Sequence, residues 1–83
     1  MLIVKILGSG CANCKHVEQI ARKVISDMGL QAEVVKVTEY PEIMKYQLLA
    51  TPGLVVNEQL VCAGRIPGES EVTTWMVNAL QGA

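Results

Sequence analysis

Apolar residues along the chain follow two patterns, one typical of buried strands and the other of amphipathic helices. The run 2–7 is apolar except at Lys5, which predicts a strand covered on both faces. In Ala12–Met28 the apolar residues recur at helical spacing, and Gly29 follows as a C-cap glycine. The run Ala32–Val37 predicts a second strand, nearer a sheet edge because its alternation is mixed. Together these elements predict a right-handed βαβ unit with parallel strands.

The middle of the chain predicts a short helix followed by a β-hairpin. Within Thr38–Leu49, Pro41 suits the first turn of a helix, and the apolar positions predict two to three turns. Two runs rich in Val and Leu predict strands over Gly53–Asn57 and Gln59–Ala63. The pair Asn57–Glu58 would form the hairpin turn between them.

The last predicted element is an amphipathic helix from Glu69 onward. Either Gly68 or Ser70 could be its N-cap, and the sequence does not decide between them. Trp75 and Met76 are expected in the core. The complete order, β-α-β-α-β-β-α, predicts an α/β fold with a four-stranded mixed sheet, the first strand central and helices on both faces. A chain of 83 residues accommodates one such domain, over residues 1–83.

Charge and hydropathy narrow the possible partners and compartment. The formal net charge is −1, and the seven Lys and Arg residues are scattered along the chain. This distribution argues against nucleic acid and against an anionic membrane surface as partners. The first apolar run is too short and too charged for a signal peptide or a membrane span, so we expect a cytoplasmic protein.

The residues that carry chemistry are Cys11 and Cys14, which form a CxxC motif between the first strand and the first helix. Unpaired N–H groups at a helix start favour a thiolate at Cys11. Cys14 lies one turn further on, close enough to close a disulfide with Cys11. Gly8 and Gly10 leave the turn conformationally free and keep side chains away from the first sulfur. In a reducing compartment such a motif indicates redox or metal chemistry.

The stretch Gly8–Lys15, together with Thr51–Pro52 before the hairpin, resembles the thioredoxin superfamily, and in particular the small glutaredoxin-like redox-active disulfide proteins of prokaryotes. The resemblance covers nearly the whole chain and implies a thioredoxin-like fold. It implies that Pro52 is cis and faces the disulfide. It also implies that Thr51 pairs with an extended substrate through its backbone, and that Gly64 is the family's glycine after the hairpin.

The resemblance further implies thiol–disulfide exchange. Cys11 would attack a substrate disulfide and Cys14 would resolve the mixed disulfide, with no cofactor beyond the Cys11–Cys14 pair. The partners would be protein disulfides and an upstream disulfide reductase. Because a partner must reach Cys11, we expect a monomer. The chain lacks the glutaredoxin pattern of two glycines and Asp after the hairpin, since Gly64–Pro67 holds one glycine and no Asp. The electron donor therefore stays open between a flavin reductase, a ferredoxin-linked reductase and glutathione.

Each of four further residues allows a structural and a functional interpretation. Lys15 is either a cationic support for the Cys11 thiolate or a surface lysine. Cys62 is interpreted as a small core residue, the alternative being a third thiol for regulation or metal. His16 points away from Cys14 on the helix and is interpreted as a solvated surface residue, the alternative being a metal ligand. Lys5 is interpreted as a lysine whose ammonium reaches solvent, the alternative being a cation that lowers the thiol pKa values.

The main alternative function is binding or transport of a soft metal. Cu(I), Zn(II) or arsenite would be held by Cys11 and Cys14, as in ferredoxin-like metal-binding domains that place a CxxC at the same turn. Those domains end on a strand, whereas this chain is predicted to end on a helix and carries Thr51–Pro52. These features favour the redox interpretation. An interaction module with a vestigial CxxC is a third possibility, which no residue pattern supports.

Overall fold

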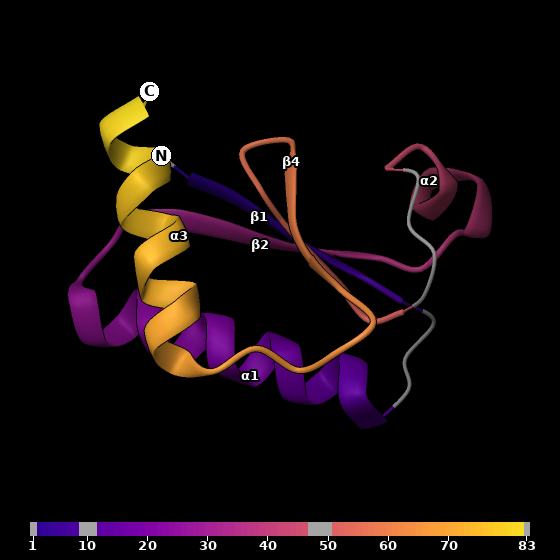
Figure 1. Ribbon diagram of the computed structural model, residues 1–83, viewed down its shortest axis with the longest axis horizontal. Helices are drawn as coiled ribbons and strands as arrows, with labels where there is room; N and C mark the ends of the chain where they lie inside the picture. The colour runs from indigo at the N-terminus through magenta and orange to yellow at the C-terminus, as the bar shows by residue number, and fades with distance from the viewer. Residues whose placement is uncertain (1, 9–11, 47–50, 83) are drawn as a thin grey trace.

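The computed structural model describes residues 2–8, 12–46 and 51–82, and these residues build one four-stranded sheet with three helices (Figure 1). The strands are β1 (Leu2–Leu7), β2 (Ala32–Val37), β3 (Gly53–Val56) and β4 (Gln59–Ala63). The sheet order is β2-β1-β3-β4, with β1 parallel to β2 and antiparallel to β3, and β3 antiparallel to β4. This arrangement confirms the predicted α/β topology, with β1 central and β2 at an edge.

Helices cover both faces of the sheet, as predicted. The helices are α1 (Ala12–Met28), α2 (Tyr40–Met44) and α3 (Glu69–Gly82). In Figure 1, α1 and α3 lie together on one side of the sheet, and the short α2 lies apart from them. Within the described ranges, no helix has the length and apolar character needed to cross a membrane.

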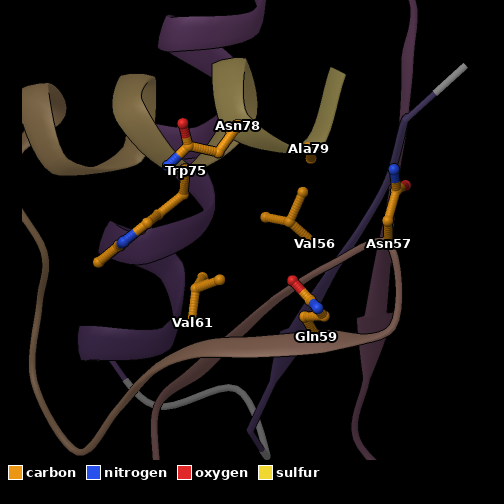
Figure 2. Close-up of a pocket in the computed structure, with 7 residues that line it drawn as sticks. All are labelled: Val56, Asn57, Gln59, Val61, Trp75, Asn78 and Ala79. Carbon is orange, nitrogen blue, oxygen red and sulfur yellow. The ribbon is translucent and has the colours of Figure 1, made fainter. Parts of the chain in front are cut away.

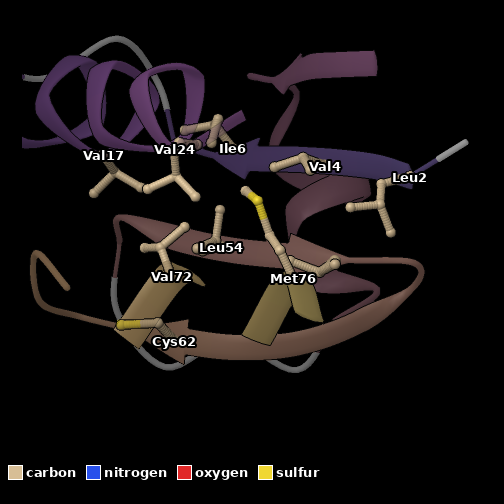
Figure 3. Packing of buried hydrophobic residues seen from close by; sticks show 11 residues of the cluster. Leu2, Val4, Ile6, Val17, Val24, Leu54, Cys62, Val72 and Met76 are labelled. Atoms are coloured by element: carbon tan, nitrogen blue, oxygen red, sulfur yellow. The ribbon is translucent and has the colours of Figure 1, made fainter. Parts of the chain in front are cut away.

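The alternating side chains of β1 divide the core into two clusters. Leu2, Val4 and Ile6 face the larger cluster, which Figure 3 shows between the sheet, α1 and α3. Met76 of α3 points into this cluster and is fully buried. Leu7 faces the smaller cluster on the α2 side. Because β1 is covered on both faces, its apolar run is nearly continuous.

Two of the predicted turns have the expected local geometry. Gly29 ends α1 with a φ of +64°, and Leu30 N–H donates to the Ile25 carbonyl at 3.0 Å. This i to i−5 bond is typical of a glycine C-cap. Asn57 and Glu58 have φ of +49° and +69°, the pattern of a type I′ hairpin turn.

The structure also shows which residue is the N-cap of α3. The Glu71 carboxylate accepts a hydrogen bond from the Gly68 N–H at 3.1 Å, and Gly68 precedes the first helical residue. Glu71 is the third residue of the helix, so this contact is one half of a capping box. Of the two candidates, Gly68 is therefore the N-cap.

The prediction for the second helix was wrong in length. Instead of two to three turns, α2 has five residues, and Lys45 and Tyr46 form a turn after it. Of the helix residues only Ile43 is buried, and a short helix needs packing to persist. The predicted apolar residues Leu48 and Leu49 lie outside the described residues.

Two smaller expectations also need correction. The third strand ends at Val56 rather than Asn57, because Asn57 belongs to the turn and its Oδ1 accepts a hydrogen bond from Ile3 N–H at 2.9 Å. Trp75 is half-buried rather than a full core residue. It packs at the margin of the larger cluster, while its neighbour Met76 is buried inside it.

Candidate functional site

Cys14 lies in the first turn of α1 and is sheltered, with 5% of its surface exposed. It is disulfide-bonded. A sheltered second cysteine is what the CxxC motif predicts for the resolving position. Cys11 and Gly10 lie outside the described residues, so their roles and the pairing of Cys11 with Cys14 stay predictions.

Gly8 makes room for the Cys14 sulfur. A Cβ atom at Gly8 would overlap Cys14 Sγ and would lie 3.9 Å from the Cβ of Thr51. Cys14 and Thr51 therefore approach the same point at the end of β1. The sequence prediction was that Gly8 and Gly10 keep side chains away from the sulfur of Cys11, and it stays a prediction because Cys11 lies outside the described residues. The contact that the structure describes for Gly8 is with the second cysteine, Cys14.

The segment Thr51–Pro52 lies at this same end of the sheet. The peptide bond between the two residues is cis, as the resemblance implies, with Pro52 buried and Thr51 exposed. The Pro52 carbonyl accepts a hydrogen bond from the Gly64 N–H at 2.8 Å. Gly64 has a φ of +78°, which favours glycine there. This bond joins the residues before β3 to those after β4 beside Cys14.

A cavity of about 50 Å³ adjoins Cys14. Its lining comes from β1, α1, β2 and the loops after β1 and β2: Ile6, Gly8, Cys14, Lys15, Glu18, Lys36 and Thr38. Glu18, Lys36 and Thr38 were not identified from the sequence. Glu18 is four residues after Cys14, and i, i+4 spacing on a helix would have placed both on one face.

Lys15 and Lys5 have different surroundings. Lys15 is exposed and reaches the rim of the Cys14 cavity, so its proposed support of Cys11 stays a prediction. Lys5 Nζ donates to Tyr46 Oη at 2.8 Å and pairs with Glu58. Hydrogen bonds from Lys5 to Glu58 and Tyr46 raise the pKa of the ammonium group. Lys5 therefore faces the α2 side, where Glu58 and Tyr46 hold its charge.

Neither Cys62 nor His16 lines the Cys14 cavity. Cys62 is a free cysteine in the larger core cluster, and burial raises the pKa of its thiol. Its Sγ contacts the Arg65 carbonyl at 3.7 Å. His16 is exposed, as predicted. In the parts of the chain that the structure describes, no three His, Cys, Asp or Glu side chains are grouped to hold a metal ion.

A larger groove of about 340 Å³ lies between α3 and the β-hairpin (Figure 2). Trp75 and Asn78 line it from α3, and Asn57 and Gln59 line it from the hairpin. Its lining is uncharged and contains no cysteine. Asn57 N–H donates to the Ile3 carbonyl, at the end of β1 opposite Gly8, so this groove is separate from the Cys14 site.

Known proteins resemble this chain along nearly its full length. The family described as thioredoxin domain matches residues 2–77. A protein named thioredoxin from Methanothermobacter thermautotrophicus is 38% identical over 72 residues, which is 87% of this chain and 94% of that protein. Another protein of that name, from Methanocaldococcus jannaschii, is 32% identical over 82 residues, covering 99% of this chain and 94% of that protein.

A solved structure shares the fold. Thioredoxin 1 from the thermophilic eubacterium Thermosipho africanus superimposes with a TM-score of 0.58 at 20% identity, covering 95% of this chain and 94% of that one. This match supports a thioredoxin-like fold for the sheet and helices described above. The chain belongs to the thioredoxin-domain family.

Proposed function

We propose that this protein is a thiol–disulfide oxidoreductase that acts on protein disulfides through Cys11 and Cys14. Family membership supports activity of this type in general. The observation that carries the assignment to Cys14 is its position, sheltered in the first turn of α1 and disulfide-bonded, with Gly8 and Thr51 beside its sulfur. Because Cys62 is free, Cys11 is the remaining cysteine of the chain, which supports the Cys11–Cys14 pair.

The exchange proceeds in two steps. The Cys11 thiolate attacks a substrate disulfide, forms a mixed disulfide and displaces one substrate thiolate. Cys14 then loses its proton and attacks the Cys11 sulfur, which closes the Cys11–Cys14 disulfide and releases the second substrate thiolate. Two electrons pass to the substrate, whose two thiolates take up protons. An upstream disulfide reductase returns two electrons to the chain.

The residues around Cys14 have separate tasks in this scheme. Thr51 is exposed and offers its backbone to an extended substrate segment, while the neighbouring Pro52 carbonyl is already bonded to Gly64 N–H. Gly8 leaves space for the Cys14 sulfur at the floor of the site. Glutaredoxin-like size, cytoplasmic location and a monomeric state complete the proposal. No cofactor is required, because the disulfide itself carries the two electrons.

A redox titration tests the proposal. The metal-free protein is equilibrated in graded ratios of reduced and oxidised dithiothreitol, the thiols are alkylated, and peptide masses identify which cysteines change. We expect Cys11 and Cys14 to interconvert together at one potential, with Cys62 unchanged. Cys14→Ser is expected to accumulate the mixed disulfide with a protein substrate such as insulin, whereas Cys62→Ser is the matched control and turns over like the wild type.

The same titration separates this function from soft-metal binding. If Cys11 and Cys14 form no reversible pair, the oxidoreductase proposal is wrong. Zn(II) and Cu(I) titrations of the wild type and of Cys14→Ser then test the alternative that the two sulfurs hold metal.

A further inference from the structure

The groove between α3 and the β-hairpin has a lining without charge and lies at the end of β1 opposite Gly8. Figure 2 shows Trp75 and Asn78 on one side of it and Gln59 and Val61 on the other. Its volume of about 340 Å³ falls in the range of ligand sites, about 300–1,000 Å³. A charged group buried here would be left unpaired, so the lining favours an uncharged ligand.

The polar side chains of the groove have unused hydrogen-bonding capacity. The side-chain amides of Gln59 and Asn78 make no hydrogen bond within the described ranges, and both residues are exposed. Asn57 uses its Oδ1 to accept from Ile3 N–H, which leaves its NH₂ group available. A carboxamide offers two donors and an acceptor with two lone pairs. Peptide groups, each with one N–H donor and one C=O acceptor, match this set.

The hairpin side of the groove is also an edge of the sheet. In the order β2-β1-β3-β4, β4 pairs only with β3 among the described strands. Sheet edges are commonly protected by charged side chains or proline. The other edge, β2, carries Glu33 and Lys36, whereas β4 has the sequence Gln-Leu-Val-Cys-Ala, with neither a charge nor a proline. An uncharged edge strand is a template to which an extended peptide can pair.

A β-bulge turns one residue of β4 towards the groove. Val61 has no partner in β3, whereas its neighbours Leu60 and Cys62 both have one. Because of this extra residue, Val61 and Cys62 both pack on the larger core cluster, although successive side chains of a strand normally alternate between faces. Val61 therefore joins Gln59 in the wall of the groove. A strand added beside β4 would bring every second side chain up to Val61 and Trp75.

We propose that the groove and the edge of β4 together bind an extended, uncharged peptide segment of a partner protein. The segment adds a strand beside β4 through backbone hydrogen bonds, and its apolar side chains pack on Trp75 and Val61. The carboxamides of the groove bond its peptide groups. The Cys14 site lies at the other end of β1 and stays open while the segment is bound. This docking role adds to the proposed function and does not depend on it.

Trp75 is the one tryptophan of the chain, so tryptophan fluorescence reports on the groove. The probe is the acetylated and amidated peptide Ser-Thr-Val-Thr-Leu-Thr-Val-Thr-Ser, in which apolar residues alternate as in a strand. One comparison peptide has proline in place of the leucine, and another has aspartate there. Each peptide is titrated into the oxidised protein. We expect a saturable blue shift of the emission with the probe, and affinities about tenfold lower for the other two peptides.

Two variants place opposite charges on the two sides of the groove. Gln59→Lys and Asn78→Asp alter exposed residues, so we expect both to fold, which circular dichroism checks. Each sets an unpaired charge against the uncharged probe and should weaken its binding about tenfold. For the aspartate peptide the effects should diverge, with Gln59→Lys binding it more tightly than the wild type and Asn78→Asp more weakly. The matched controls Gln19→Lys and Gln19→Glu change an exposed residue of α1 outside the groove and should bind every peptide like the wild type.

Nuclear magnetic resonance of isotope-labelled protein locates the bound peptide. The probe should shift the amide resonances of β4 and the indole N–H of Trp75, and should slow hydrogen exchange in β4. The proposal is refuted if the probe causes no saturable change, if the proline peptide binds equally well, or if both groove variants bind the probe like the controls. Shifts of the same resonances that grow with protein concentration without peptide would also overturn it, because they would assign the groove to a second copy of the chain. None of these measurements involves a redox step, so their outcome is independent of the proposed function.

Discussion

Replacement of Gly8 by alanine tests the packing at the centre of the proposed site. The added Cβ would overlap the Cys14 sulfur, and neither side has room to move freely, because Gly8 is buried and its N–H donates to the Val37 carbonyl at 3.0 Å. Overpacking of this kind costs about 1–3 kcal/mol. We expect Gly8→Ala to lower the free energy of unfolding of the oxidised protein by about 2 kcal/mol.

The cost should depend on the redox state. In the oxidised protein the disulfide holds the Cys14 sulfur in place, whereas in the reduced protein the thiol can rotate away from the new methyl group. Urea unfolding of both states, followed by circular dichroism, gives the two free energies. If Gly8→Ala costs the oxidised protein about 1.4 kcal/mol more than the reduced protein, the equilibrium constant for reduction of the disulfide rises about tenfold. The reduction potential is then about 30 mV less negative.

The matched control is Gly29→Ala. Gly29 also has a positive φ, but nothing lies within 4 Å of a Cβ built there, so alanine brings only backbone strain of about 1–2 kcal/mol. That cost should be equal in the oxidised and reduced proteins. Equal costs of Gly8→Ala in the oxidised and reduced proteins, or a reduction potential equal to that of the wild type, would contradict this prediction.

Two further predictions concern stability. Met76 is fully buried, so Met76→Ala should lower the free energy of unfolding, measured by urea titration, by about 2–5 kcal/mol. Leu80 on the same helix is 46% exposed, so Leu80→Ala should change it by less than about 0.5 kcal/mol. Hydrogen bonds from Arg65 and Gly68 lower the pKa of Glu71 to about 2 from 4.5, so its stabilising effect is complete above pH 4.5 and is lost as the pH falls towards 2. Glu71→Gln should therefore flatten the pH dependence of unfolding between pH 5 and 2, and an unchanged slope would contradict this assignment.

Local patterns were enough to identify most elements. The bounds of α1, β1, β2 and β4 agree with the prediction because each element buries one or two faces along its own length, so hydrophobic periodicity marks it directly. The caps at Gly29 and the hairpin turn at Asn57–Glu58 also depend on neighbouring residues only. The length of α2 was predicted wrongly because this helix has only one buried residue, Ile43, and so lacks a hydrophobic periodicity that marks its end.

The candidate site was only partly predictable. The spacing of Cys11 and Cys14 indicates redox chemistry by itself, and the family resemblance adds Thr51, Pro52 and Gly64. That Gly8 makes room for the Cys14 sulfur follows from how α1 packs on β1. Residues far apart in the chain meet through sheet pairing, which no local periodicity encodes.

Charged residues show most clearly which features follow from the sequence and which depend on the tertiary structure. The sequence by itself determined the type of each element, the redox motif and the position of Glu18 one turn after Cys14. Only the tertiary structure decided that Lys36 joins Glu18 at the Cys14 cavity and that Lys5 pairs instead with Glu58 across the sheet. The physical reason is that helix and strand periodicity arises within one segment, whereas the partner of a charge depends on the register and packing of several segments.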